Sequence, residues 1–323
     1  MKMLDIETGL SPHQPEPPTK IAGFGIPLYS YPAIPPFLQG NPNITDGYRA
    51  HLSPKLCVKS ACILSNETIN IWSHLLGLVL FTFYQLYDNF YYLPENRAET
   101  GDHFTFTVMN LCFQVCMFCS AGYHLFSCQS EVASRRWLRL DLAGVSVGMC
   151  GCYFPGAYYA FYCNQFWESA YMFAMFVLVG VCLLAQAHSE YLSNDWYRRR
   201  LMLYAAFIFA GVVPVMHWVL QTGGFGEPFV QLFMPKVLVM YVLVLLGGLF
   251  YISQFPEKLF PGRVNMFGSS HQWWHIMILI AFGWAHHMGV VVFTHWRTHS
   301  CTIVTQTNND DSWSLYTFLG IKV

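Results

Sequence analysis

Five polar side chains in otherwise apolar stretches have types and spacings suited to metal chemistry. His271 and His275 are four residues apart near the start of the last apolar stretch. A helix would place both imidazoles on one face, where they can bind one metal ion together. Ser120 and His124 are also four residues apart near the end of an earlier apolar stretch, and Asp141 opens the next one. Ionisable groups inside a bilayer are costly and usually functional, so these five are candidate site residues.

The composition is that of a membrane protein. The 323 residues are 54% hydrophobic and only 11% charged, whereas a soluble domain carries roughly 25% charged residues. The net charge of −1 gives no support for nucleic-acid binding, so we expect no nucleic-acid partner.

Apolar windows of about 20 residues are long enough to cross the hydrocarbon core as helices. The sequence therefore predicts an all-α membrane protein with a seven-transmembrane helix bundle. Pro155 and Pro214 lie inside predicted spans and should bend them. The predicted spans are 70–92, 104–127, 138–161, 169–187, 201–221, 232–252 and 272–296.

The connections between these spans alternate in basic residues. The first, third and fifth connections carry only Arg97, and the second, fourth and sixth carry eight lysines and arginines. Because basic loops stay in the cytosol, we expect a cytosolic N-terminus and a lumenal C-terminus. Cys163 and Cys301 would then share the oxidising side, where a disulfide between them is possible. The eight basic residues are Arg135, Arg136, Arg139, Arg198, Arg199, Arg200, Lys258 and Arg263.

The chain divides by composition into three parts. Residues 1–62 form a cytosolic arm rich in proline. The arm ends in a short amphipathic surface helix, which Ser53-Pro54 is expected to start. Residues 63–297 form the transmembrane domain, and 298–323 form a lumenal tail. Within the arm we expect residues 1–22 to be a loose tail, whereas 23–55 are either loose or dock as an extended peptide on a partner.

The predicted orientation places the five polar side chains at one depth, near the cytosolic leaflet. Three neutral imidazoles, from His124, His271 and His275, suit Zn²⁺ and leave a fourth position open for water. Asp141 could hold that water or orient a ligand, and the Ser120 hydroxyl could stabilise a developing oxyanion. These groups meet the needs of a hydrolase acting on a lipid amide, although the zinc could equally be structural.

The other intramembrane histidines suggest simpler roles. A lone histidine in an apolar stretch is usually held by a hydrogen bond, and we expect this of His74. His286, His287 and His295 approach the far side of the last span, so we do not expect them to join the cluster.

Several motifs together resemble the progestin and adipoQ receptor family, over about Asn41 to Trp296. The resemblance implies seven helices, a cytosolic N-terminus and a zinc ion on the three histidines. It also implies that Asp141 engages the zinc-bound water and that Ser120 is the motif serine of the family. The motifs are Ser65-Asn66-Glu67-Thr68 with Asn70-Ile71-Trp72-Ser73-His74, Ser120-x-x-x-His124, Leu140-Asp141-x-x-Gly144 and Ser270-His271-Gln272-x-x-His275.

Segments 41–50, 123–128 and 268–272 are similar to one branch of that family. This resemblance implies a Golgi membrane protein whose cytosolic arm retains Raf kinase and restrains MAP kinase signalling. The wider family implies two alternatives, a zinc-dependent amidohydrolase acting on ceramide-like lipids and a receptor for a steroid or adipokine-type ligand. Composition and spacing do not decide among the three, and the closer resemblance favours the Golgi protein that retains Raf.

Overall fold

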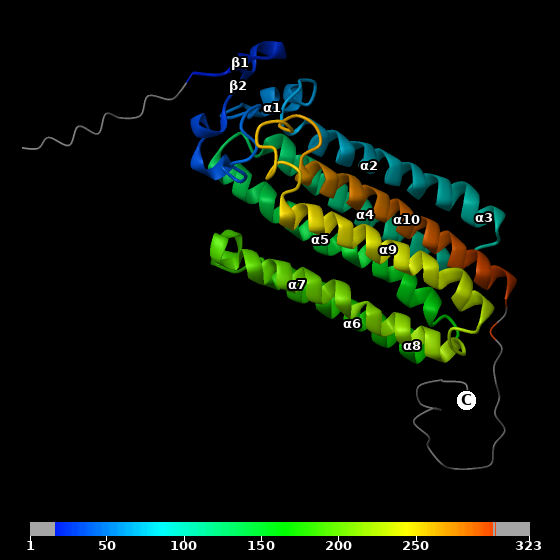
Figure 1. Ribbon diagram of the computed structural model, residues 1–323. Helices are drawn as coiled ribbons and strands as arrows, with labels where there is room; N and C mark the ends of the chain where they lie inside the picture. Colours follow the sequence, from blue (N-terminus) through cyan, green and yellow to red (C-terminus); the bar gives the residue numbers. More distant parts are fainter. Residues whose placement is uncertain (1–16, 300, 302–323) are drawn as a thin grey trace, which may run out of the picture.

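The computed structural model describes residues 17–299 and residue 301. Its long helices run alongside one another as one bundle (Figure 1). In chain order they are α2 (Thr68–Tyr87), α4 (Thr100–Phe126), α5 (Glu131–Ala160), α6 (Gln165–Ala185), α7 (Tyr197–Ala210), α8 (Val212–Thr222), α9 (Pro228–Ser253) and α10 (Ser270–Thr298).

Two of the helical rods are interrupted. α2 continues through a π-helical turn, Asp88–Tyr92, into α3 (Leu93–Glu95). α7 ends at Ala210, and α8 begins two residues later. A proline ring clashes with the carbonyl four residues before it, and Pro214 stands in that relation to Ala210. By contrast, α5 continues through Pro155.

Six helical segments are long and apolar enough to cross a membrane: 68–95, 100–126, 165–185, 197–222, 228–253 and 270–298. The helix α5 is not among them, although its 30 residues make it the longest. The first three turns of α5 are rich in charge, which lowers the apolar character of the helix as a whole. They carry Glu131, Arg135, Arg136 and Arg139. The seven-span count and the orientation therefore stay predictions.

The bundle packs around α4. Half of the apolar window of α4 is buried within the chain, compared with 11% of the windows of α6 and α9. Phe113 of α4 stacks on Phe282 of α10, with ring centroids 4.3 Å apart, and also contacts Phe81 of α2. The exposed faces of α6 and α9 are the surfaces that would meet lipid.

Small residues bring α5 against α4 and α10. A Cβ atom added at Gly148 would lie 2.5 Å from the ring of Phe282, and one at Gly144 would lie 3.1 Å from the Cα of Cys116. Glycines spaced four apart allow such close backbone approach between membrane helices. This contact brings the first turns of α5 beside the end of α4, where two of the candidate site residues lie.

The arm is folded onto one end of the bundle (Figure 1). Ile26 and Leu28 are buried in a cluster with Cys57 and Cys128. The segment 25–29, expected to be loose or to dock on a partner, therefore packs on its own chain. The arm contains β1 (Lys20–Ile21) antiparallel to β2 (Pro27–Leu28), the 3₁₀ turns η1 (Gly23–Gly25), η2 (Tyr31–Ala33) and η3 (Pro36–Leu38), and α1 (Pro54–Ser60).

Hydrogen bonds join this arm to the loop before α10. The backbone N–H of Thr45 donates to Asn265 at 2.9 Å, and the N–H of Gly262 donates to the carbonyl of Asn43 at 3.0 Å. At the opposite end of the bundle Cys163 and Cys301 form a disulfide. The expected tail 1–22 falls mostly outside the described residues, as does 298–323.

Candidate metal centre

Three imidazoles from two helices converge at the end of the bundle that carries the arm. His124 lies in the last turn of α4, and His271 and His275 lie in the first two turns of α10. The Nε2 atoms of His124 and His271 are 3.3 Å apart, and those of His271 and His275 are 3.2 Å apart. One nitrogen from each ring lies within 4.8 Å of the others. The three histidines predicted to meet do meet, and they could hold a metal ion.

The spacing of these nitrogens fits a tetrahedral ion. With metal–nitrogen bonds of about 2.0–2.1 Å, tetrahedral geometry places ligand nitrogens about 3.3–3.4 Å apart. The two measured Nε2 separations are close to this value. His124 and His275 are both buried, which keeps their rings in place.

A carboxylate that the sequence analysis did not assign holds the first of these rings. Glu67, just before α2, accepts a hydrogen bond from Nδ1 of His124 at 2.7 Å and one from Asn70 at 2.7 Å. Burial would raise the pKa of Glu67, but the charge and hydrogen bond of His124, with help from Asn70 and Arg49, lower the pKa to about 2. The bond at Nδ1 leaves Nε2 of His124 free as a ligand. Asp141 was expected to orient a ligand, but at His124 the partner is Glu67.

His74 lies beside the three histidines without joining them. Its ring stacks on His275, with centroids 3.9 Å apart and planes 24° apart. The group that could hold a metal ion does not include it. His74 is therefore a packing partner of a candidate ligand, and its expected role as a hydrogen-bonder stays a prediction.

Ser120 and Asp141 lie next to the three histidines. Ser120 is buried one turn before His124 on α4, and Asp141 is partly buried in the third turn of α5. The Ser120 hydroxyl and the His124 ring lie within electrostatic reach of the Asp141 carboxylate. A carboxylate in this position can accept and return protons beside the candidate metal.

The arm and the loop before α10 both fasten the ligand helices. Arg49, which is buried, donates to the backbone carbonyl of His124 at 2.6 Å and to Ser60 at 2.5 Å. Glu257 is fully buried and accepts hydrogen bonds from the backbone N–H of Ser270 at 2.8 Å and from its hydroxyl. A carboxylate at a helix N-terminus satisfies free N–H groups and complements the helix dipole. It thereby fixes the turn of α10 that carries His271.

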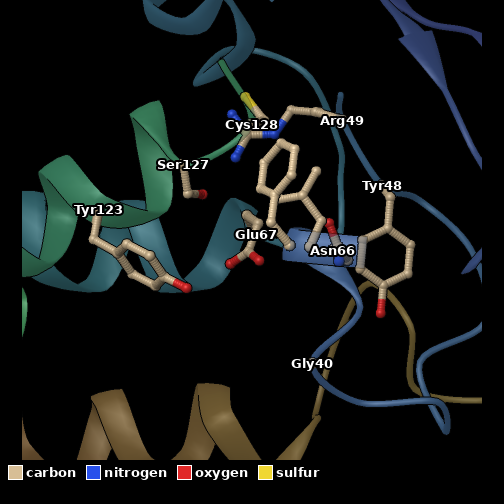
Figure 2. A pocket seen from close by; sticks show the side chains of 10 residues that line it. Gly40, Tyr48, Arg49, Asn66, Glu67, Tyr123, Ser127 and Cys128 are labelled. Carbon is tan, nitrogen blue, oxygen red and sulfur yellow. The ribbon is translucent and has the colours of Figure 1, made fainter. Parts of the chain in front are cut away.

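A small polar cavity opens beside Glu67 (Figure 2). It encloses about 90 Å³ and is lined by arm residues together with Glu67, Tyr123 and Ser127. In the described part of the chain Nε of Arg49 and Oδ1 of Asn66, both buried, have no hydrogen-bond partner. A water needs roughly 10–15 Å³ of such space and two to four polar partners. The cavity can therefore bring several waters to the arm side of the metal centre.

A second buried polar cluster lies elsewhere in the bundle. Asp88 accepts hydrogen bonds from His286 at 2.8 Å and from Asn110 at 2.9 Å, and Tyr84 stacks on the His286 ring at 4.1 Å. As expected, His286 does not join the three histidines. The pairing of His286 with Asp88 was not predicted from the sequence. A charged residue inside the predicted span 70–92, Asp88, could have indicated it.

Comparisons with known proteins show which family the chain resembles. A family model described as "Haemolysin-III related" matches residues 62–288, which include all three histidines. The chain is 48% identical over 278 residues to "Progestin and adipoQ receptor family member 3" of Homo sapiens, covering 86% of this chain and 89% of that protein.

More distant relatives extend the match. "Adiponectin receptor protein" of Drosophila melanogaster is 29% identical, with 84% of this chain and 61% of that protein covered. "Heptahelical transmembrane protein 1" of Arabidopsis thaliana is also 29% identical, with 84% and 82% covered. With a family model over most of its length and such identity across nearly all of a relative, the chain belongs to the haemolysin-III related family and, within it, to the progestin and adipoQ receptors.

Proposed function

We propose that the protein is a seven-span Golgi membrane protein that retains Raf kinase through its folded cytosolic arm, which a zinc centre helps to hold in place. The observation that carries the proposal is the direct bond between the two parts: Arg49 of the arm donates to the backbone of His124 at 2.6 Å. The Golgi location and Raf follow from the resemblance to one branch of the family and from the 48% identity to its member 3.

The helix α5 supplies the seventh span of this proposal. Residues 142–160 contain no charged side chain, and at 1.5 Å per residue they cover about 28 Å, close to the roughly 30 Å hydrocarbon core. Two observations support a cytosolic arm. The basic connections lie at the end of the bundle that carries the arm, which fits the cytosol. The disulfide between Cys163 and Cys301 lies at the other end, which fits an oxidising lumen.

Zinc is the ion that three neutral imidazoles with an open fourth position suit best. His124, His271 and His275 would hold it, and Glu67 would orient the first ring. When bound, the ion supplies Lewis-acid chemistry and ties α4 to α10. The arm rests on both helices, through Arg49 and through the loop that contains Glu257.

The Raf proposal is tested with the full chain, because the arm packs on the bundle and a fragment would lose those contacts. Ile21 and Phe24 are both 59% exposed and are among the large apolar side chains that the described part of the arm offers a partner. We expect Ile21→Ala/Phe24→Ala to weaken co-purification of Raf kinase at least tenfold. Phe225→Ala, equally exposed between α8 and α9 at the opposite end, is the control. Absence of Raf binding by the wild type, or equal binding by the arm variant, would remove the proposal.

The second candidate function is zinc-dependent hydrolysis of a lipid amide of the ceramide type, and Asp141 is the observation that favours it. Its carboxylate is within electrostatic reach of His124, and a carboxylate there would take a proton from the attacking water and return it to the leaving amine. Ser120, which interacts with Asp141, would keep the carboxylate in position.

Fatty acid release from a panel of lipid amides, followed by mass spectrometry on purified protein, tests this candidate. We expect Asp141→Asn to abolish release while the zinc content and Raf binding persist. Asp195→Asn, in an exposed turn, should leave release unchanged. Equal release by Asp141→Asn and wild type would refute the role of Asp141, and no release by zinc-loaded wild type would refute hydrolysis while leaving the Raf proposal intact.

A further inference from the structure

A basic pocket lies between the start of α5 and η5 (Ser189–Leu192), the 3₁₀ turn that precedes η6 (Asn194–Trp196) and α7. We call it the arginine pocket, because Arg135, Arg136 and Arg139 of α5 line it together with Val132, Ser189 and Leu192. Its volume is about 200 Å³, and it shares no lining residue with the cavity beside Glu67.

The arginine pocket has an excess of positive charge. Arg135 is paired with Glu131 on its own helix at 2.8 Å. Within the described part of the chain, Arg136 and Arg139 have no carboxylate within ion-pair distance. Glu190, in the facing turn, is exposed and lies outside the lining. At least two guanidinium groups are therefore free to bind an anion.

The donors in the arginine pocket match a phosphate group. A guanidinium offers a planar fork of N–H donors that binds two phosphate oxygens at once. The Ser189 hydroxyl on the opposite wall adds a further donor. A phosphomonoester carries between about −1.5 and −2 charges at neutral pH, which matches two unpaired arginines better than the single charge of a phosphodiester.

The position of the arginine pocket favours a lipid over a soluble phosphate. Leu140 follows Arg139 directly and is 47% exposed, and Leu184, near the end of α6, is 75% exposed. Both belong to the apolar surface of the bundle, so the pocket lies where that surface gives way to charged residues. An anionic lipid bound there could keep its acyl chains against these leucines while its phosphate contacts the arginines.

We propose that the arginine pocket binds the phosphomonoester headgroup of an anionic membrane lipid of the phosphatidylinositol phosphate type. Basic pockets between membrane helices on the cytosolic side suit such headgroups. The site would select the lipid composition around the protein, independently of the metal centre and of any kinase bound to the arm.

The test uses the full-length protein in detergent and a phosphatidylinositol 4-phosphate labelled on its acyl chain, with binding followed by fluorescence anisotropy. Each basic side chain near an anionic lipid contributes roughly fivefold to binding, so we expect Arg136→Gln/Arg139→Gln to weaken binding about 30-fold. Arg198→Gln/Arg199→Gln removes the same charge from exposed positions at the start of α7, outside the pocket lining, and should weaken binding less than threefold.

Three further measurements distinguish the arginine pocket from misfolding, from diffuse charge attraction and from a soluble phosphate ligand. Arg136→Lys/Arg139→Lys keeps the charge but loses the forks, and an intermediate affinity with an unchanged elution volume supports the pocket and excludes misfolding. Phosphatidylserine should compete at least tenfold less well than unlabelled phosphatidylinositol 4-phosphate. Equal losses in both glutamine variants would show diffuse attraction and overturn the site. Displacement by inorganic phosphate or a soluble inositol phosphate as effective as by the lipid would overturn the assignment to a lipid.

Discussion

Replacement of Glu67 tests whether the three histidines form a metal site with an oriented first ligand. Glu67 makes one charge-assisted hydrogen bond to His124, at 2.7 Å, and bonds of this type contribute roughly 1.5–3 kcal/mol. Loss of a partner that orients a ligand typically weakens metal binding 10–100-fold, or about 1.4–2.7 kcal/mol. The two ranges agree. We therefore expect about 100-fold weaker zinc binding in Glu67→Ala and about tenfold in Glu67→Gln, which keeps an acceptor but loses the charge.

Competition with a chromophoric zinc chelator on purified protein measures this affinity. Glu95→Gln, an exposed carboxylate beyond α2, controls for the change in net charge and should leave the affinity within twofold of wild type. His275→Ala should abolish stoichiometric zinc and so define the background. Zinc affinity of Glu67→Ala within twofold of wild type would refute the argument, because it would mean that the His124 ring needs no partner at Nδ1.

Three further changes probe the bundle and its arm. Gly148→Leu should lower the thermal unfolding midpoint by several degrees, because even a Cβ there would lie 2.5 Å from Phe282 and overpacking costs roughly 1–3 kcal/mol. Gly180→Leu, at an open position, should leave the midpoint unchanged. Asp88→Ala should destabilise the protein by about 3 kcal/mol, since it leaves a buried histidine unpaired, without loss of zinc; an unchanged midpoint would contradict this. A mild thiol oxidant should join Cys57 to Cys128, whose sulfurs are 3.7 Å apart. The Cys57 hydrogen bond lowers the pKa of Cys128 to about 7, so the thiolate is present above pH 7 and cross-linking should slow below it, as peptide mapping would show.

The bundle and the three histidines could be predicted because both depend on regular periodicities. Apolar windows locate helices, and alternation of the spans fixes which helix ends share a depth. His124 and His271, 147 positions apart in the chain, could thus be placed together without knowledge of any contact. The four-residue spacing then brought His275 onto the same face.

The contacts that hold these ligands could not be predicted in the same way. Glu67 lies in the turn before α2, outside any periodic segment, and its reach to His124 depends on how that turn folds. Arg49 belongs to a proline-rich stretch whose composition suggests a loose tail. Its structure comes from contacts with the bundle, such as the burial of Ile26 and Leu28 against Cys128, and these contacts leave no local pattern in the sequence.

The arm and the loop before α10 tie the candidate metal centre to the end of the bundle that carries the arm. Glu257 accepts from Ser270 at the start of α10 and also from Asn41 of the arm at 3.1 Å, while Arg49 binds the last turn of α4. Movement of either ligand helix would therefore strain a buried, charge-assisted hydrogen bond, either the bond from Arg49 or the bond to Glu257, which also holds Asn41 of the arm. Such bonds are strong where solvent is excluded. Removal of zinc should then expose the arm to proteolysis even in a protein whose helices stay folded. If the chelated protein is cleaved in residues 23–52 no faster than the zinc-loaded protein, the two parts are coupled only by proximity.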